Sequence, residues 1–174
     1  EFRRVLFRSA DIVDEVVEHS LKLYEGDRRG LVLIDTSTQE PDRAAARAQR
    51  LRARGIEMLD ATISGTSEMC EKKDIIFMVG GSEPVFEQSR PIYAALGKDA
   101  FHVGANGTGG ISKLVVNCVL TLNRFALAEG LTLAKKSGID QARMLAVLKK
   151  SAAYSNAMDQ KGERMVKRDF DKPA

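Results

Sequence analysis

The sequence predicts an α/β domain with a partly parallel sheet, followed by a long helix and an all-helical region. Three observations predict this class. Strand-like and helix-like segments alternate over residues 10–106, a long glycine-poor stretch follows at 111–137, and helix-start signals recur after it. We expect the boundary between the α/β domain and the helical region at about residue 106.

The elements of the α/β domain each have a local signal. Residues 11–19 place branched apolar side chains at helical spacing. Residues 31–34 are wholly apolar, which predicts a parallel strand buried on both faces. Residues 41–54 are rich in alanine and arginine, and this predicted helix begins at Pro41 and ends before Gly55.

Three more strands and one more helix complete this region. The strands are predicted at residues 58–63, 74–79 and 101–103, and residues 64–67 between the first two are expected to lack regular structure. The helix extends from its Ser82 cap to Leu96 and contains Pro91, a residue type that breaks or kinks helix interiors.

The helical region begins with a long amphipathic segment. Residues 111–137 contain no proline and only Gly130, which predicts a helix roughly 40 Å long at about 1.5 Å per residue. Gly138 ends it, and Asp140 and Ser155 mark the starts of two further helices. Four of its positions are expected in the core: Leu114, Cys118, Leu122 and Leu127.

Composition excludes several classes of protein. The 174 residues are 44% apolar and 29% charged, and no uninterrupted apolar run approaches the roughly 20 residues that span a bilayer. The two cysteines and two histidines lack metal-ligand spacing, so we expect no metal site and a reducing, cytoplasmic environment. Residues 1–9 carry a net charge of +2 and resemble a translated cloning adapter. The remaining charge is +1 (3 minus 2), which does not indicate a nucleic-acid partner.

Three segments contain residues suited to chemistry. Residues 35–41 (Asp-Thr-Ser-Thr-Gln-Glu-Pro) follow the first strand at its carboxyl edge, where open α/β sheets bind ligands. Residues 60–66 (Asp-Ala-Thr-Ile-Ser-Gly-Thr) end the second strand, and residues 107–117 (Gly-Thr-Gly-Gly-Ile-Ser-Lys-Leu-Val-Val-Asn) open the long helix. In that helix Lys113 and Asn117 share one face, as a proton-transferring amine beside an amide that can orient a substrate.

In this order the three segments resemble the β-hydroxyacid dehydrogenase family, which includes 3-hydroxyisobutyrate dehydrogenase and tartronate semialdehyde reductase. The family patterns are D-x-S-T-x-x-P, D-A-P-V-S-G-G and G-x-G-x-x-x-K-x-x-x-N. The resemblance covers residues 11–174. It implies a truncated Rossmann-type cofactor-binding domain at 10–106 and a helical substrate and dimerisation domain at 107–174, incomplete at its C-terminus.

The resemblance also implies a function. Family enzymes transfer a hydride between NAD or NADP and a short β-hydroxy acid or its semialdehyde, and they are homo-oligomers. Lys113 matches the family's catalytic lysine, a general acid and base. The other matching positions are Ser64, Gly65, Thr66 and Asn117 for the substrate and Thr38 for the cofactor.

The chain departs from the family pattern at two kinds of position. Thr62 replaces the motif proline and Thr66 replaces its second glycine, which leaves the identity of the hydroxy acid open. No G-x-G-x-x-G follows a strand, and the late K-D-L segment is missing. We therefore expect an internal fragment of a longer enzyme that is inactive alone and binds dinucleotide poorly.

Each proposed role also has a plainer alternative. Lys113 could be a solvated lysine, Asn117 a polar contact between helices, residues 64–65 an ordinary turn and Thr38 part of a helix start. Asp60 is expected to be a structural hydrogen-bonding residue. For the whole chain, the alternatives are a non-catalytic oligomerisation module and a 6-phosphogluconate dehydrogenase relative, which would need a basic phosphate cluster.

Overall fold

The computed structural model describes residues 10–169 and residue 171. The adapter-like segment expected at residues 1–9 lies outside them. The chain divides into two compact units, unit 1 at residues 1–115 and unit 2 at residues 116–174.

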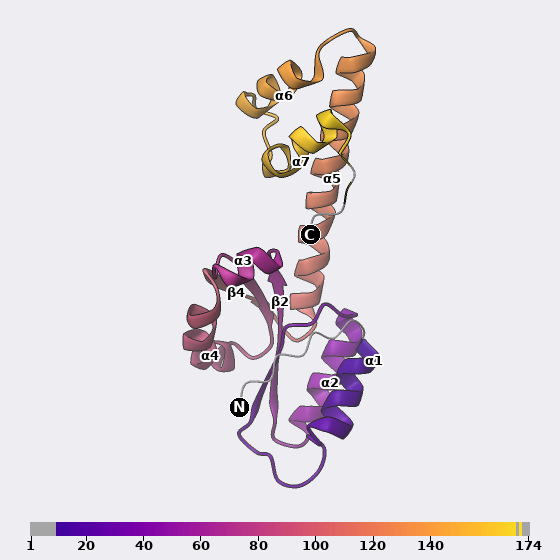
Figure 1. The fold of residues 1–174 in the computed structure, drawn as a ribbon. Helices are drawn as coiled ribbons and strands as arrows, with labels where there is room; N and C mark the ends of the chain where they lie inside the picture. The colour runs from indigo at the N-terminus through magenta and orange to yellow at the C-terminus, as the bar shows by residue number, and fades with distance from the viewer. Residues whose placement is uncertain (1–9, 170, 172–174) are drawn as a thin grey trace. The chain divides into compact units, whose positions relative to one another are not determined.

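Unit 1 is an α/β domain, as predicted, and the predicted strands are present within a few residues of their expected ends (Figure 1). Its described elements are, in chain order, α1 (Ala10–Glu15), the π-helical turn η1 (Val16–Ser20), β1 (Val32–Asp35), α2 (Pro41–Arg52), β2 (Glu57–Ser64), α3 (Ser67–Glu71), β3 (Ile76–Gly80), α4 (Glu83–Leu96), β4 (Asp99–Gly104) and the first turns of α5 (Thr108–Lys136).

The described strands form one sheet in the order β1-β2-β3-β4. The β1–β2 and β3–β4 pairs are parallel, while β2 and β3 are antiparallel. The reason lies in the connections. A parallel crossover needs about a dozen residues or more, and only residues 65–75 join β2 to β3. The sheet is thus mostly parallel, with one reversal in the middle.

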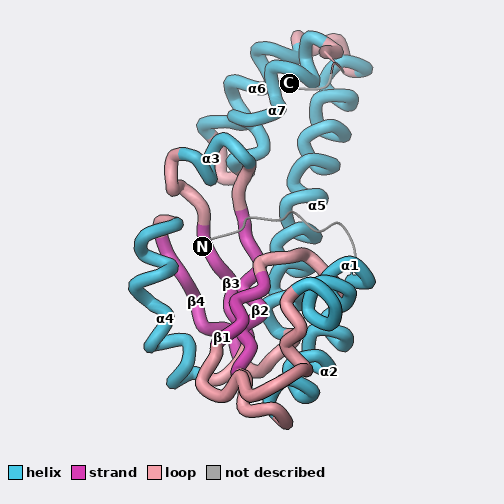
Figure 2. The backbone as a smooth tube through the Cα atoms, turned by 60° about the horizontal axis from the view of Figure 1, so that its bottom comes forward, coloured by secondary structure: helices cyan, strands magenta, loops and turns pink. Residues whose placement is uncertain are grey.

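Side chains of β2 point alternately to the two faces of the sheet, and both faces are covered by helices. Met58 packs on one face with apolar side chains of α1, η1 and α2. Leu59 and Ala61 point to the other face, where they pack with Phe77 of β3 and with side chains of α4. Figure 2 shows α1 and α2 on one side of the sheet and α4 on the other. The arrangement therefore has three layers.

Two local predictions are wrong, and a third is confirmed. β1 is not buried on both faces, because Val32 is 38% exposed at the edge of the described sheet. Residues 64–67 lead directly into the short helix α3, whose N-cap is Thr66. The predicted end of α4 at Leu96 is confirmed, and Pro91 lies inside the helix without ending it.

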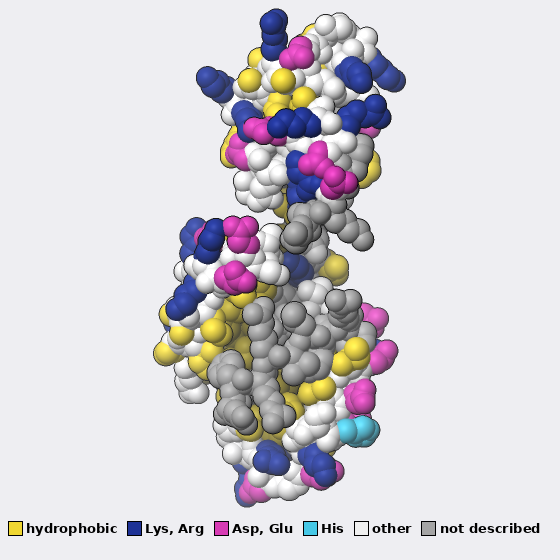
Figure 3. Space-filling model, in the orientation of Figure 1, with side chains coloured by type: hydrophobic (Ala, Val, Ile, Leu, Met, Phe, Trp, Pro, Cys, Tyr) yellow, Lys and Arg dark blue, Asp and Glu magenta, His cyan; other side chains and the backbone are white. Residues whose placement is uncertain are grey.

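Unit 2 consists of the remainder of α5 with α6 (Gln141–Lys150) and α7 (Asn156–Lys167). Both shorter helices start where predicted, and the Asp140 side chain caps α6 by accepting a 2.9 Å hydrogen bond from the Arg143 amide. A small core joins the three helices through Leu127, Leu131, Leu145 and Met158. Figure 3 shows lysine and arginine side chains spread over the visible surface of α6 and α7, with acidic side chains among them.

The prediction for the apolar face of α5 is wrong for three of its four positions. Leu127 is 2% exposed, but Leu114 is 57% and Leu122 62% exposed, and Cys118 is exposed as well. Helical period identifies an apolar face, but it does not tell whether the same chain covers it. Other exposed apolar side chains of α5 are Ile111, Val115, Val119, Phe125 and Leu133.

By length and composition alone, α5 is able to cross a membrane. Its most apolar 18-residue window has a mean hydropathy of 1.4, and 11% of that window is buried. The start of α5 is nevertheless part of unit 1, because the Gly109 amide donates to Asp60 of β2. This contact favours a helix that packs against protein.

Candidate active site

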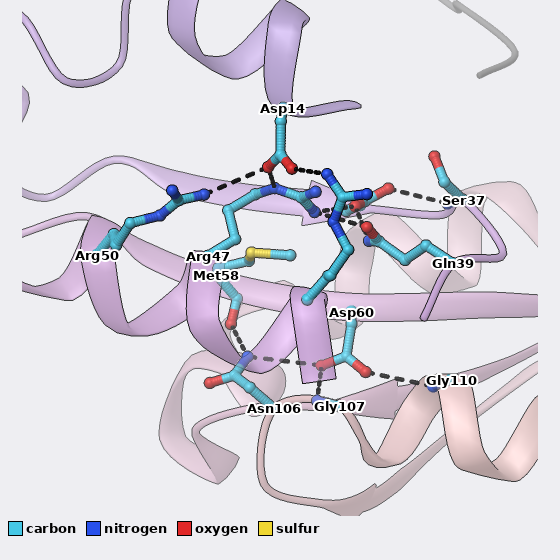
Figure 4. A network of polar contacts seen from close by, with 12 residues as sticks. Asp14, Ser37, Gln39, Arg47, Arg50, Met58, Asp60, Asn106, Gly107 and Gly110 are labelled. Atoms are coloured by element: carbon cyan, nitrogen blue, oxygen red, sulfur yellow. Dashed lines mark hydrogen bonds and ion pairs between the residues drawn. The ribbon is translucent and has the colours of Figure 1, made fainter. Parts of the chain in front are cut away.

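The start of α5 is held by one buried carboxylate on β2. Asp60 accepts hydrogen bonds from the amides of Gly107 (2.9 Å), Gly109 (2.9 Å) and Gly110 (3.4 Å). Figure 4 shows this carboxylate between the helix start and the Asn106 side chain. The first amides of a helix lack partners within the helix, and its N-terminus favours negative charge. Asp60 meets both needs, which is the structural role expected for it.

Glycine is required in this run because the helix start lies against backbone. A Cβ at Gly109 would lie 2.1 Å from the Asp60 carbonyl oxygen. Gly107 has φ +95, and a Cβ there would lie 2.8 Å from the Pro41 carbonyl oxygen. The glycines therefore bring α5 against β2 and α2. Burial raises the pKa of the Asp60 carboxyl, and its backbone hydrogen bonds only partly offset this.

Lys113 lies one turn beyond this anchor, with its amine directed to the end of β2. Its Nζ donates a 2.6 Å hydrogen bond to the carbonyl oxygen of Ile63, the residue directly before Ser64. The side chain is half-buried, and burial lowers the pKa of the amine. The structure thus brings Lys113 to the turn that contains the predicted substrate residues.

The predicted substrate residues of unit 1 form the turn after β2. Ser64 is half-buried at the end of the strand, while Gly65 and Thr66 are exposed. A Cβ at Gly65 would lie 2.5 Å from the Ile75 side chain, so this position needs glycine. Thr66 caps α3, because its hydroxyl oxygen accepts a 3.2 Å hydrogen bond from the Met69 amide. The departure from glycine at this position therefore has a local structural reason.

The two remaining predicted residues lie elsewhere. Asn117 is exposed on α5, one turn after Lys113, and belongs to unit 2. Thr38 is exposed in the loop between β1 and α2. The alternative interpretation of Thr38 as part of the helix start is not supported, because Glu40 is the N-cap of α2.

The loop that carries Thr38 is held by Asp35 at the end of β1. The Asp35 carboxylate accepts a 2.9 Å hydrogen bond from the Ser37 amide and another from the Gln39 side chain. It also pairs at 3.3 Å with Arg47 of α2, whose side chain is fully buried. The loop conformation is therefore set by a buried ion pair beneath it.

Arg47 is the centre of a polar network that the sequence did not reveal. Its guanidinium donates to Asp14 of α1 at 2.7 Å and to Gln39 at 2.8 Å (Figure 4). Asp14 also accepts from Arg43 at 2.6 Å and pairs with Arg50 at 3.3 Å. Burial acts to raise the pKa of Asp14, but the hydrogen bonds from Arg47 and Arg43 outweigh it and lower the pKa. The available signal was the spacing of the three arginines, which puts them on one face of α2.

Comparison with known proteins agrees with this architecture. Residues 4–104 match the model of the NAD binding domain of 6-phosphogluconate dehydrogenase. Residues 107–174 match the model described as the NAD-binding of NADP-dependent 3-hydroxyisobutyrate dehydrogenase.

Individual relatives point the same way. The chain is 34% identical to 2-(hydroxymethyl)glutarate dehydrogenase of Eubacterium barkeri, over 91% of this chain and 52% of that protein. It is 33% identical to 2-hydroxy-3-oxopropionate reductase of Escherichia coli (strain K12), over 91% of this chain and 54% of that protein. The chain therefore spans about half the length of the curated relatives it matches.

A solved structure shares the fold at high similarity. The 3-hydroxyisobutyrate dehydrogenase of Mycobacterium tuberculosis, solved with L-serine, superposes with a TM-score of 0.85 at 25% identity, over 97% of this chain and 59% of that one. The matched domains and relatives agree with the three motifs and with the sheet, and they support a nicotinamide cofactor. The chain belongs to the β-hydroxyacid dehydrogenase family.

Proposed function

We propose that this chain carries the proton-transfer lysine and part of the substrate site of an NAD(P)-dependent dehydrogenase. The enzyme would interconvert a short β-hydroxy acid and its semialdehyde. One observation carries the proposal: the half-buried Lys113 amine is held at 2.6 Å on the Ile63 carbonyl, directly beside the turn at residues 64–66.

The chemistry required of Lys113 suits this environment. The reduced nicotinamide, when bound, supplies the hydride that reaches the carbonyl carbon of the semialdehyde. Lys113 gives a proton from Nζ to the carbonyl oxygen, and its positive charge stabilises the negative charge that develops there. In the oxidative direction the neutral amine takes the proton of the substrate hydroxyl. Burial lowers the pKa of Lys113, which makes the neutral amine needed in the oxidative direction easier to form.

The substrate would be held by the turn after β2 and by α5. We assign the substrate carboxylate to the Ser64 hydroxyl and to the backbone amides of Gly65 and Thr66. The Thr66 hydroxyl can still donate a hydrogen bond, because its cap contact uses only the oxygen as acceptor. Asn117 would orient the substrate oxygen with its side-chain amide.

The residues near the end of β1 fit the nicotinamide end of a dinucleotide. Ligands of open α/β sheets bind outside the carboxyl ends of the strands. Thr38 is exposed there, on a loop that Asp35 holds in place. The glycine run at residues 104–110 does not fit the phosphates, because the amides of Gly107 and Gly109 already donate to Asp60. We therefore assign only the nicotinamide end to this chain, through Thr38.

Replacing Lys113 tests the proposal. In the intact protein from the complete reading frame, K113A should lower kcat for reduction of small semialdehydes by about 10²–10⁴-fold, the range of general acid–base catalysis. Binding of NADH or NADPH, measured by fluorescence titration, should stay the same, because Lys113 does not hold the dinucleotide.

The control replaces Lys72, an exposed lysine paired with Glu68 on α3, and K72A should turn over as the unchanged protein does. Unchanged turnover of K113A would overturn the acid–base role. Failure of the unchanged protein to bind either dinucleotide or to reduce any semialdehyde would instead support a non-catalytic module. Turnover of 6-phosphogluconate would identify a relative that uses a phosphorylated substrate.

A further inference from the structure

Thr62 is a buried polar residue that the proposed reaction does not use. It lies on β2, where the family pattern has proline, and it is 1% exposed. Its hydroxyl donates a 2.7 Å hydrogen bond to the carbonyl oxygen of Gly109 in the first turn of α5. The Met78 carbonyl lies farther away, at 3.5 Å. The single hydroxyl proton therefore goes to the helix.

The position of Gly109 connects this bond to Lys113. In an α-helix the carbonyl of residue i accepts the amide of residue i+4, so the Gly109 carbonyl belongs to the turn that carries Lys113. A shift of this turn relative to β2 would move the lysine Cα with it.

Lys113 makes a second hydrogen bond between the same two elements, this time from α5 to β2. The lysine Nζ binds the carbonyl of Ile63, the residue that follows Thr62 on β2. Thus a strand side chain binds the helix backbone, and a helix side chain binds the strand backbone one residue further on. The two bonds enclose a small ring of contacts, and each restricts the geometry of the other.

The Asp60 contacts do not make Thr62 redundant. Asp60 binds amides at the start of α5 and so fixes the end of the helix. Thr62 binds a carbonyl, which points along the helix toward Lys113. Asp60 thus accepts hydrogen bonds from helix amides, and Thr62 donates one to a helix carbonyl. Together these two contacts restrict the rotation of α5 about its axis as well as its position.

We infer that Thr62 is a positioning residue for Lys113, because its hydroxyl holds the first turn of α5 where the lysine amine reaches the end of β2. The motif proline cannot make this bond, since it has no hydroxyl. The inference rests on the proposed acid–base role of Lys113 for its effect on turnover, but the positioning itself can be measured independently.

The test compares T62V, which removes the hydroxyl at nearly constant size, with T62S, which keeps it. T108V is the matched control, because the Thr108 hydroxyl also donates at 2.7 Å to a backbone carbonyl at the same helix start, but that carbonyl belongs to Ala105 and not to β2. In the intact protein we would measure kcat and KM across pH. We would also measure acetic anhydride labelling of Lys113 by mass spectrometry, with exposed Lys72 as internal reference.

T62V should lower kcat by about 10–100-fold, the loss expected for a misplaced catalytic group. KM should change less. Labelling of Lys113 at alkaline pH, where both lysines are largely neutral, should increase because the amine is less protected, and the alkaline limb of the pH profile should move toward the range of an ordinary lysine. T62S and T108V should stay close to the unchanged protein in all these measurements.

Other outcomes are equally informative. If T62V only melts at lower temperature, with unchanged labelling and pH profile in the folded protein, Thr62 is structural and the inference is overturned. Increased labelling with unchanged kcat would uphold the positioning and overturn the acid–base role of Lys113. If T62V does not fold, T62A removes the same hydroxyl without the valine methyl groups, and the same criteria apply to it.

Discussion

Single residues in this protein have roles that their type alone does not reveal. Asp60 stands at the beginning of a motif associated with substrate binding. Its carboxylate oxygens nevertheless already accept hydrogen bonds from the amides at the start of α5. Thr66 stands in the expected substrate turn and also caps α3. Asp60 and Thr66 therefore hold the backbone of the site in place, whatever they contribute to ligand binding.

The Asp60 anchor leads to a stability prediction. D60N keeps one carbonyl oxygen but turns an amide group toward the helix amides, so at least one buried donor loses its acceptor. We expect a loss of about 1–3 kcal/mol in the free energy of unfolding, measured by urea denaturation.

The control for D60N is D74N, which removes an exposed carboxylate paired with Lys98 at 3.1 Å. That change should cost less than about 1 kcal/mol, as for other surface ion pairs. Equal losses for D60N and D74N would show that the Asp60 contacts contribute nothing particular to stability.

At the scale of elements, the long helix α5 differs most from expectation. It contributes Leu127 and Leu131 to the core of unit 2, while a second set of apolar side chains remains exposed. We propose that these exposed residues mediate the homo-oligomer that the family resemblance implies.

Replacing Leu122 and Phe125 together by glutamate should prevent self-association of the intact protein, because the carboxylates would be buried against apolar surface at high cost. Sedimentation equilibrium would measure the change in mass. N123E, at an exposed position of the same helix, is the control and should assemble normally. A double variant that still assembles like the unchanged protein would contradict this role for α5.

The sequence predicted the strands and long helices because their apolar periods are clear. It failed where the outcome depends on contacts between distant segments. Arg47 resembles any surface arginine of an alanine-rich helix, and only the approach of α1 and β1 makes it a buried residue. The exposure of Leu122 could not be predicted either, because an apolar stripe is compatible with any partner. In the candidate site, the Lys113 contact agrees with the motif, whereas the Thr62 contact depends on a departure from it.

For the whole molecule, the chain combines two compact units that match two different domain models. The amides of the glycine run at residues 104–110 that would face a phosphate already donate to Asp60, and no G-x-G-x-x-G follows a strand in the sequence. We therefore expect residues 1–174 alone to bind NADH and NADPH poorly. Isothermal titration calorimetry can check this, with the protein from the complete reading frame as comparison. Micromolar binding by these residues alone would show that the chain has a phosphate site that its motifs do not indicate.

The contact between Asp60 and the start of α5 also has a consequence for the order of folding. The amides of Gly107 and Gly109 lie 47 and 49 positions after Asp60 in the chain, and Lys113 lies 50 positions after Ile63. Closing loops of that length carries a large entropic cost before any contact repays it. β3, α4 and β4 lie within those loops, so they can form from nearer neighbours first. We therefore expect the Lys113 amine to reach its place among the last events in the folding of unit 1.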